Sequence, residues 1–400
     1  MAQPDIIVTI GEGGLGRPLA DKDHISGMIL YHEDATLPAG FMGGVRIKTV
    51  FSLVEAEALG IVEGSADFGL LWYHIREYFR LQPKGELKVN IIDATAFVWA
   101  THDFEEITTL QLDAEGTIRQ VGIIQMQNAF LTANVSAIQT VCAALRADSQ
   151  PLSAILAPDI SAVADLTTLT DLRTLASPLV SVVIGEDGAA RGAALAVSET
   201  TSASTLGATL GAASLANVNE SIAWVGKFNL SDGIELEVAN FANGEAVKTK
   251  SSAFLDALND KGYIFLRKFT KKRGFAGTYH NNSPTATVVS SDFAFLENNR
   301  TIDKATGFIE FNVLPLLNSP LKVQSDGTLF EETSLTFLNL TKKGLQDMKN
   351  AQEISDFEVI IDPTQNVLST STVKVTVRII PVGVARNIEF TIGYALNLTA

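Results

Sequence analysis

The strongest constraint on this chain is the strict alternation of apolar and polar residues near its C-terminus. Apolar residues stand at odd positions over 373–379 and, after a turn at 381–383, at even positions over 388–398. A period of two indicates a strand with one buried and one solvated face. We therefore predict a hairpin of two strands that ends the chain. An open strand edge with an apolar face invites pairing with another chain, which points to assembly rather than catalysis.

Composition narrows the class of protein further. A chain of 400 residues with a net charge of −15 and one cysteine, Cys142, is expected to fold into two or three domains without an internal disulfide or a cysteine-based metal site. The charge disfavours binding to nucleic acid. No apolar run approaches the roughly 20 residues of a membrane helix, and no basic region precedes an apolar one at the N-terminus. We expect a cytosolic origin, no direct membrane insertion and no signal peptide.

Strand and helix patterns alternate along the first two thirds of the chain, which predicts an α/β fold. The predicted fold class is a mixed-sheet α/β core followed by a C-terminal α+β domain, with extended N- and C-terminal β arms. The expected parts are an arm at 1–25, a core at 26–266 with room for an outward-facing subdomain around 95–262, an α+β domain at 267–386 and a strand arm at 387–400.

Several helices are predicted from periodicity. In the helix near 68–79, one apolar stripe recurs at helical spacing, and His74, Arg76, Glu77 and Arg80 fall largely off it. Further helices are expected at 166–175, 292–305 and 334–351.

One glycine-rich segment has the spacing of a dinucleotide-binding loop, with Gly11, Gly13 and Gly16. That loop requires a helix to begin inside it, so that helical N–H groups face the pyrophosphate. Arg17 and Pro18 follow at once, and the residue before a proline is biased away from helix. We interpret the glycines as a hinge after a short strand at 5–10, and we expect no cofactor.

Candidate catalytic residues are few. Asp93 and Asp159 follow predicted strands, where α/β enzymes keep carboxylates, although such aspartates are also common turn and cap residues. His102 and Asp103 could act as a base and its orienting acid, but a solvated loop is the simpler interpretation. No histidine spacing fits a metal site. The sequence therefore predicts neither a catalytic residue nor a metal ligand.

Four segments carry a resemblance to a known family. They are Arg273-Gly274-Phe275-Ala276-Gly277-Thr278-Tyr279 with the loop 281–283, Ser291-Asp292-Phe293 with Asn299-Arg300-Thr301-Ile302-Asp303-Lys304, the ending around Ile380-Pro381-Val382, and Gly13-Gly14-Leu15-Gly16-Arg17-Pro18 with Asp23-His24-Ile25-Ser26-Gly27. They resemble the sheath protein of contractile tails, found in myophages, R-type bacteriocins and related injection systems. The N-terminal segment is similar to Mu-like and Bacteroidetes prophage sheath proteins.

The resemblance implies a structural subunit that polymerises as stacked hexameric rings around a tail tube and contracts without consuming nucleotide. Its partners would be further copies of itself, the tail tube protein, and baseplate and tail terminator proteins. It would assemble in the bacterial cytoplasm and then belong to a virion tail or contractile particle. Sheath arms add strands to sheets of neighbouring subunits. That assigns an inter-subunit role to Ile6, Val8, Ile10, Ile388, Phe390, Ile392, Tyr394 and Leu396.

An acidic sheath subunit needs a local basic face to attach weakly to an acidic tube, because exposed charge pairs are worth only about 0–1 kcal/mol each. Two sets of residues are candidates. One is the cluster Lys268, Lys271, Lys272 and Arg273, and the other is Lys342 with Lys349 on the predicted helix 334–351. Both sets could instead be ordinary solvated surface.

Two other functions stay open at this point. One is a different tail or capsid component, although tube proteins are usually shorter and all-β. The other is an α/β enzyme that binds a nucleotide or small molecule at the strand carboxyl ends, which would need a convergent polar site.

Overall fold

The computed structural model of the protein describes residues 22–32, 36–41, 46–269 and 275–394, and it divides into two compact units, Met1–Phe311 and Asn312–Ala400. The first unit is built around one seven-stranded sheet with the order β2-β3-β1-β4-β5-β6-β9. Its strands are β1 Ser26–His32, β2 Ile47–Val50, β3 Leu87–Asp93, β4 Gln120–Ala129, β5 Ser153–Asp159, β6 Val180–Val183 and β9 Tyr263–Ile264. Only β2 runs antiparallel to its neighbour; the other pairs are parallel.

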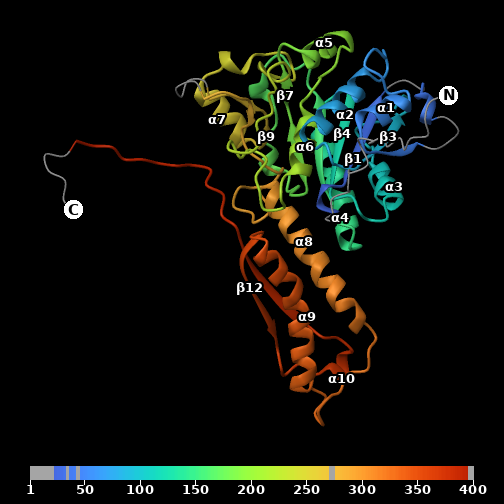
Figure 1. The fold of residues 1–400 in the computed structure, drawn as a ribbon, viewed down its shortest axis with the longest axis vertical. Helices are drawn as coiled ribbons and strands as arrows, with labels where there is room; N and C mark the ends of the chain where they lie inside the picture. The colour runs from blue at the N-terminus through green and yellow to red at the C-terminus, as the bar shows by residue number, and fades with distance from the viewer. Residues whose placement is uncertain (1–21, 33–35, 42–45, 270–274, 395–400) are drawn as a thin grey trace, which may run out of the picture. The chain divides into compact units, whose positions relative to one another are not determined.

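Helices cover both faces of this sheet (Figure 1). The helices of the first unit are α1 Leu53–Ala58, α2 Gly69–Leu81, α3 Glu105–Asp113, α4 Thr132–Ala147, α5 Arg191–Ser198, α6 Leu206–Leu215 and α7 Ser252–Asp260, and α8 Leu296–Val313 begins in it; short 3-10 turns lie at Lys22–His24, Ala39–Phe41 and Val247–Thr249. Gly27 of β1 faces Leu110 of α3, and Gly122 of β4 faces α6. Because Gly27 is paired with Val121, Gly122 points to the opposite face, so α3 and α6 sandwich the sheet. The mixed-sheet α/β core predicted from the sequence is confirmed.

Two small antiparallel sheets complete the first unit. Strand β7 Gly185–Asp187 pairs with β8 Ala239–Phe241, and β10 Leu266–Arg267 pairs with β11 Tyr279–His280.

Helix α6 is buried on every side, and its glycines explain how it fits. A Cβ on Gly207 would lie 2.2 Å from the carbonyl oxygen of His74, and one on Gly211 would lie 2.8 Å from that of Tyr78. The two glycines, four residues apart, therefore let α6 lie directly against the backbone of α2. His74, predicted to fall off the apolar stripe of α2, is fully buried by this contact, and its Nδ1 accepts a hydrogen bond from the Gly207 N–H at 3.3 Å.

Helix α8 begins with a turn of buried polar residues that bind the rest of the first unit. Arg300 donates to the carbonyl oxygens of Ala216 and Asn217, and Asp303 pairs with Arg146 at 2.9 Å. Lys304 pairs with Asp23 at 2.5 Å. The segment that carries the family resemblance thus has a structural role in anchoring α8.

The prediction of a helix at 166–175 is wrong. Two short 3-10 turns, Leu166–Thr168 and Leu172–Thr174, stand there instead. Asp165 and Asp171 each accept a hydrogen bond from the backbone N–H two residues on, and this local bonding competes with a continuous helix.

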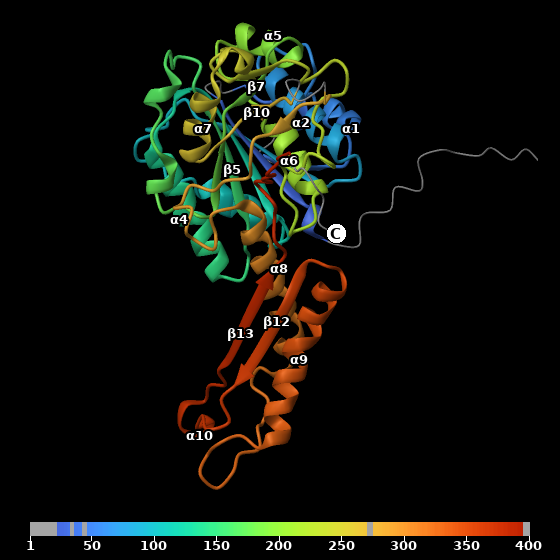
Figure 2. The same ribbon diagram turned by 90° about the vertical axis from the view of Figure 1, so that its left-hand side faces the viewer.

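The second unit is a helix packed on a two-stranded sheet (Figure 2). Helix α9 Glu331–Asn350 lies against β12 Ile354–Ile361, which pairs with β13 Val375–Pro381; the short helix α10 Val367–Thr370 connects the strands, and a 3-10 turn Leu314–Leu316 precedes α9. Buried residues of α9 recur at helical spacing, namely Phe337, Thr341, Gly344, Leu345 and Met348. The α+β ending predicted from the sequence is confirmed.

The predicted hairpin needs a correction. Strand β13 exists as expected, but its partner is β12 rather than the segment 388–398. More and less exposed side chains alternate along the paired parts of β12 and β13. The connection through α10 is short enough to join antiparallel neighbours. The described part of the expected second strand, 388–394, has no strand assignment.

Candidate functional site

The β12–β13 sheet has one covered and one open face. Directly opposite pairs such as Val359 with Val377 and Phe357 with Ile379 lie on the less exposed face, toward α9. The other face carries an exposed ion pair between Glu358 and Arg378 at 3.3 Å. The alternation read from the sequence therefore describes a sheet packed on a helix.

This sheet also has open edges. Within the described residues it contains two strands, so the outer backbone groups of β12 and β13 face no further strand. A two-stranded sheet is marginal by itself, and an unpaired edge is a template for another chain. The geometry can accept an added strand on either side.

The segment that follows β13 offers apolar side chains to solvent. Ile388, Phe390, Ile392 and Tyr394 are exposed by 71, 82, 92 and 110%. Such a regular apolar row is costly to leave in water, since each large side chain gains about 1.5–3 kcal/mol on full burial. Of the other residues assigned to inter-subunit strands, Ile6, Val8, Ile10 and Leu396 lie outside the described residues.

The basic residues proposed to face a tube differ in their surroundings. Lys349 is bound within the chain, because its Nζ lies 2.7 Å from Asp356. Lys342 is exposed on α9 and makes no ion pair with the described residues, and the same holds for the adjacent Lys343. Lys342 and Lys343 are thus adjacent exposed lysines of α9, and Lys349 is the one that pairs with a carboxylate of the chain.

The other basic cluster is described only at its start. Lys268 donates to the carbonyl oxygen of Glu237 and lies 3.4 Å from its carboxylate. Lys271, Lys272 and Arg273 lie outside the described residues.

The two strand-end aspartates serve local structure. Asp93 accepts hydrogen bonds from the N–H and hydroxyl of Thr95, and these bonds lower the pKa of Asp93. Asp159 accepts from the N–H groups of Ser161 and Ser202. Both are turn carboxylates, the simpler of the two interpretations above.

The expectation of a solvated loop at His102 is wrong. Its ring stacks on Phe97 at 4.3 Å and lies 5.6 Å from Tyr31. Its Nε2 is 3.2 Å from Glu106, which also accepts a 2.9 Å hydrogen bond from the Tyr31 hydroxyl. The partner of His102 is therefore the residue one helical turn ahead, and not the adjacent Asp103.

A cleft of about 840 Å³ opens at the carboxyl ends of β4 and β5, where α/β enzymes bind ligands. Its lining contains Asp159, already bound to backbone N–H groups, together with amide, hydroxyl and apolar side chains, and no lysine, arginine or histidine. Among the residues that the structure describes, no group of three or more His, Cys, Asp and Glu side chains could hold a metal ion. The carboxylate in this cleft is thus engaged by backbone N–H groups of its own turn and of Ser202.

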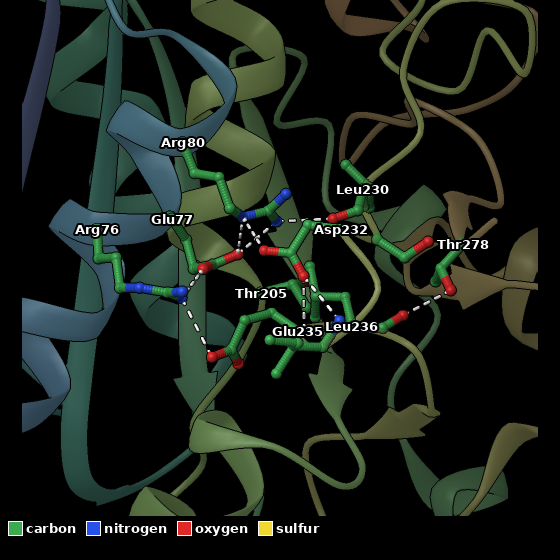
Figure 3. Close-up of polar contacts among 12 residues, drawn as sticks. Arg76, Glu77, Arg80, Thr205, Leu230, Asp232, Glu235, Leu236 and Thr278 are labelled. Atoms are coloured by element: carbon green, nitrogen blue, oxygen red, sulfur yellow. Dashed lines mark hydrogen bonds and ion pairs between the residues drawn. The ribbon is translucent and has the colours of Figure 1, made fainter.

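A buried charge cluster, unsuspected from the sequence, joins α2 to the loop 230–237 (Figure 3). Glu77 of α2 pairs with Arg76 at 2.7 Å and Arg80 at 2.5 Å, and Glu235 of the loop pairs with Arg76 at 3.2 Å. Glu77 and Glu235 are almost fully buried, and burial raises the pKa of Glu77 although the arginines oppose it. The only sequence signal was the spacing of Arg76 and Arg80 on one helical face.

Both units match models of one protein family. The model described as DUF2586, N-terminal domain matches residues 3–284, and the model described as DUF2586, C-terminal domain matches residues 292–399. The chain belongs to the DUF2586 family. A search of the curated proteins finds no match.

Solved structures with the fold of this DUF2586 protein include chains of contracted sheaths and of a baseplate. A chain in the contracted helical sheath of the anti-feeding prophage is 13% identical, with a TM-score of 0.63, and the match covers 99% of this chain and 100% of that one. A chain in the baseplate of the same particle is 12% identical, with a TM-score of 0.62 and coverage of 99% and 100%. A chain in the contracted PVC sheath complex is 11% identical, with a TM-score of 0.59 and coverage of 99% of each chain.

These matches span both units, so the resemblance to contractile tail sheath proteins is confirmed at the level of the fold. Within the described residues, no helix is long and apolar enough to cross a membrane.

Proposed function

We propose that this protein is a structural subunit of a contractile tail sheath, which polymerises as stacked hexameric rings around a tail tube and contracts to drive the tube through a target envelope. The observation that carries the proposal is the full-length similarity of fold to sheath chains, over 99% of this chain. The particle would assemble in the bacterial cytoplasm, and the tube, baseplate and tail terminator proteins would be its other partners.

The assembly step proposed is strand addition. The open edges of β12 and β13 would receive arms from neighbouring copies, and the apolar row from Ile388 to Tyr394 would continue the sheet face that α9 covers. An added strand satisfies backbone groups on both chains, and the row would lose its contact with water. The N-terminal arm, with Ile6, Val8 and Ile10, is proposed to act in the same way.

The role is proposed to be non-enzymatic. Relaxation of a subunit lattice from a high-energy extended state would supply the work, so neither a nucleotide nor another cofactor is needed. Isothermal titration with NAD, FAD and ATP should give no heat above dilution. Micromolar binding that disappears when Gly11, Gly13 and Gly16 are substituted would favour the nucleotide-binding alternative.

A second candidate is a sheath-like subunit of the baseplate, favoured by the match to a chain of a baseplate structure. Negative-stain electron microscopy of the purified full-length chain separates the two. Long hollow tubes or stacked rings support the sheath, whereas single rings that do not stack support the baseplate. A chain that stays monomeric at high concentration, with and without its tube, would contradict both.

A further inference from the structure

The cleft at the carboxyl ends of β4 and β5 lies beside a bulge in β4. The two strands pair in register up to Ile124 with Ala157, and the next pair is Ala129 with Asp159. Over that interval β4 advances five residues and β5 only two, so β4 bends away from its neighbour. The cleft has a volume of about 840 Å³, which is within the range of about 300–1,000 Å³ that is typical of small-molecule sites.

One wall of this cleft is fixed by its own hydrogen bonds. Gln127 in the bulge and Thr200 after α5 both line the cleft with a left-handed backbone, at φ of 54° and 52°. Residues with side chains keep such a conformation only where their surroundings hold it. The Gln127 N–H donates to the Thr201 hydroxyl at 3.1 Å, and its Nε2 donates to the Glu199 carbonyl at 3.3 Å. The bulge and the turn after α5 therefore hold each other, and the cleft is preformed.

A buried carboxylate lines the cleft with one uncommitted oxygen. Asp159 is only 8% exposed, and its Oδ1 accepts from the N–H groups of Ser161 at 2.9 Å and Ser202 at 3.2 Å. Its Oδ2 accepts no hydrogen bond from the residues that the structure describes. A carboxylate oxygen in a largely buried side chain is unfavourable without a donor, so Oδ2 favours a molecule in the cleft that can donate to it.

The other polar groups of the lining are mostly short and uncharged. Four of them are side-chain hydroxyls that form no hydrogen bond to the described residues, namely those of Thr132, Ser161, Thr170 and Thr200. A hydroxyl both donates and accepts, so these groups can bond a ligand that does the same. Between them lie apolar side chains, including the half-buried Phe130 and Val197, which is exposed by 81%.

These groups restrict the chemistry of a ligand. The lining contains no lysine, arginine or histidine, so a phosphate, sulfate or carboxylate group would meet the Asp159 carboxylate without a counter-charge. A purely apolar ligand would remove water from that carboxylate and from the hydroxyls without replacing its hydrogen bonds. A neutral ligand that carries many hydroxyls on a frame of C–H groups satisfies both the polar and the apolar parts of the lining.

We propose that this cleft binds a neutral saccharide. Oδ2 of Asp159 accepts from a sugar hydroxyl, the threonine and serine hydroxyls bond further sugar hydroxyls, and Phe130 with Val197 contacts the C–H faces of the sugar ring. The chemistry is the same for a free sugar and for one unit of a polysaccharide. The site lies within the first unit and requires only the folded chain, so it stands or falls independently of the proposed function.

The test is saturation-transfer NMR, with isothermal titration, of the full-length chain against maltose, lactose and N,N′-diacetylchitobiose. At least one of these neutral disaccharides should bind with a dissociation constant of about 1 mM or below. Asp159→Asn keeps an acceptor for the two N–H groups but replaces Oδ2 by a donor, so affinity should fall about tenfold. Thr170→Val removes one exposed hydroxyl at nearly constant shape and should weaken binding about threefold. Thr109→Val on α3 is the matched control, because Thr109 is exposed outside the cleft, and it should bind as wild type does.

Three results would overturn the proposal. One is the absence of saturation transfer to all three disaccharides at about 10 mM. Another is tighter binding of N-acetylneuraminic acid or spermidine than of every disaccharide, which would assign the cleft to an anion or a cation. The third is wild-type affinity in Asp159→Asn or, if that variant does not fold, in Ser161→Ala with Thr170→Val.

The source of the sugar is separated by chain length. A hexasaccharide of the disaccharide that binds should bind more tightly than the disaccharide if the cleft takes a unit of a polysaccharide, and equally if it takes a free sugar. Either outcome supports the site, provided that Asp159→Asn weakens the binding.

Discussion

The two units of this protein differ in where their charged and apolar side chains lie. In the first unit, charged residues such as Glu77 and Glu235 are buried and paired, and α6 is enclosed on every side. In the second unit, apolar residues such as Ile380 and Leu368 are exposed by 59 and 71%, and the sheet stops after two strands. The first unit thus buries ion pairs, whereas the second exposes apolar side chains beside open strand edges, as is expected if other chains cover them in the proposed assembly.

The sharpest test of this contrast is deletion of residues 387–400. The deleted segment is exposed as far as it is described, so subunit stability should change by no more than about 0.5 kcal/mol. Assembly into tubes or stacked rings should be abolished, because the open edges of the C-terminal sheet lose their proposed partner. Thermal unfolding and electron microscopy of the same preparation measure the two effects.

Point variants in the same segment separate chain length from side-chain chemistry. Phe390→Ser removes one residue of the apolar row, and Thr391→Ser is its neighbour on the alternate side. The first should weaken assembly and the second should not. Equal behaviour of the two variants would mean that the alternation has no role in assembly.

A substitution in the core of the first unit should have the opposite effect. It should lower the stability of the subunit and leave its surface unchanged. Gly207→Ala places a Cβ 2.2 Å from the His74 carbonyl oxygen, which forces α2 and α6 apart. We expect a loss of about 3 kcal/mol, at the upper end for overpacked sites. Gly307→Ala in α8 is the control, because nothing lies within 4 Å of its Cβ, and there alanine should stabilise the helix by about 1 kcal/mol. Denaturant unfolding measures both, and a Gly207 variant as stable as wild type would show that the helices can separate without cost.

Much of this architecture was predictable from periodicity. Alternation over 373–379 identified β13, and helical spacing identified α9 and α2, because each of these elements carries an apolar face that repeats at its own structural period. Periodicity in the sequence does not predict which strands pair with each other, so β12 was not recognised as the neighbour of β13. Assignment of 388–398 to a hairpin failed for that reason.

The buried polar groups were harder to foresee. His74 and Glu77 looked solvent-facing because they lie off the apolar stripe, yet α6 and the loop 230–237 cover that side of α2. The covering residues are more than 120 positions away in the chain, as the separations in those hydrogen bonds show. Likewise, His102 was judged by its sequence neighbour Asp103, whereas its contacts come from Tyr31 and Glu106.

The enclosed histidines make a smaller prediction about the first unit. Burial lowers the pKa of His74 to about 3 and that of His280 to about 4, both from an ordinary value of 6.5. Each folded-state pKa is depressed, so each neutral ring contributes stability that is present above pH 6.5 and is lost as the pH falls. Between pH 6.5 and 5 the loss should be about 2 kcal/mol for each histidine.

A variant isolates the contribution of His280 to this pH dependence. His280→Gln keeps a polar partner for Thr209, whose hydroxyl lies 2.9 Å from the histidine Nε2. The stability of wild type relative to this variant should fall as the solution is acidified from pH 6.5 to 5. A difference that stays constant over that range would show that His280 is not buried in the neutral form.

The smallest expected effect concerns the basic residues of the second unit. Lys342→Glu with Lys343→Glu should leave subunit stability within about 0.5 kcal/mol, because both side chains are exposed and neither forms an ion pair among the described residues. Lys349→Glu should cost up to about 1 kcal/mol, because it replaces an exposed pair with Asp356 by two like charges. If α9 faces the tube, the double variant should reduce co-sedimentation of sheath with tube protein more than Lys349→Glu does. A larger loss of co-sedimentation for Lys349→Glu than for the double variant would assign the tube contact to the end of α9 that carries Lys349. If both variants co-sediment with the tube as wild type does, α9 is not part of the proposed contact.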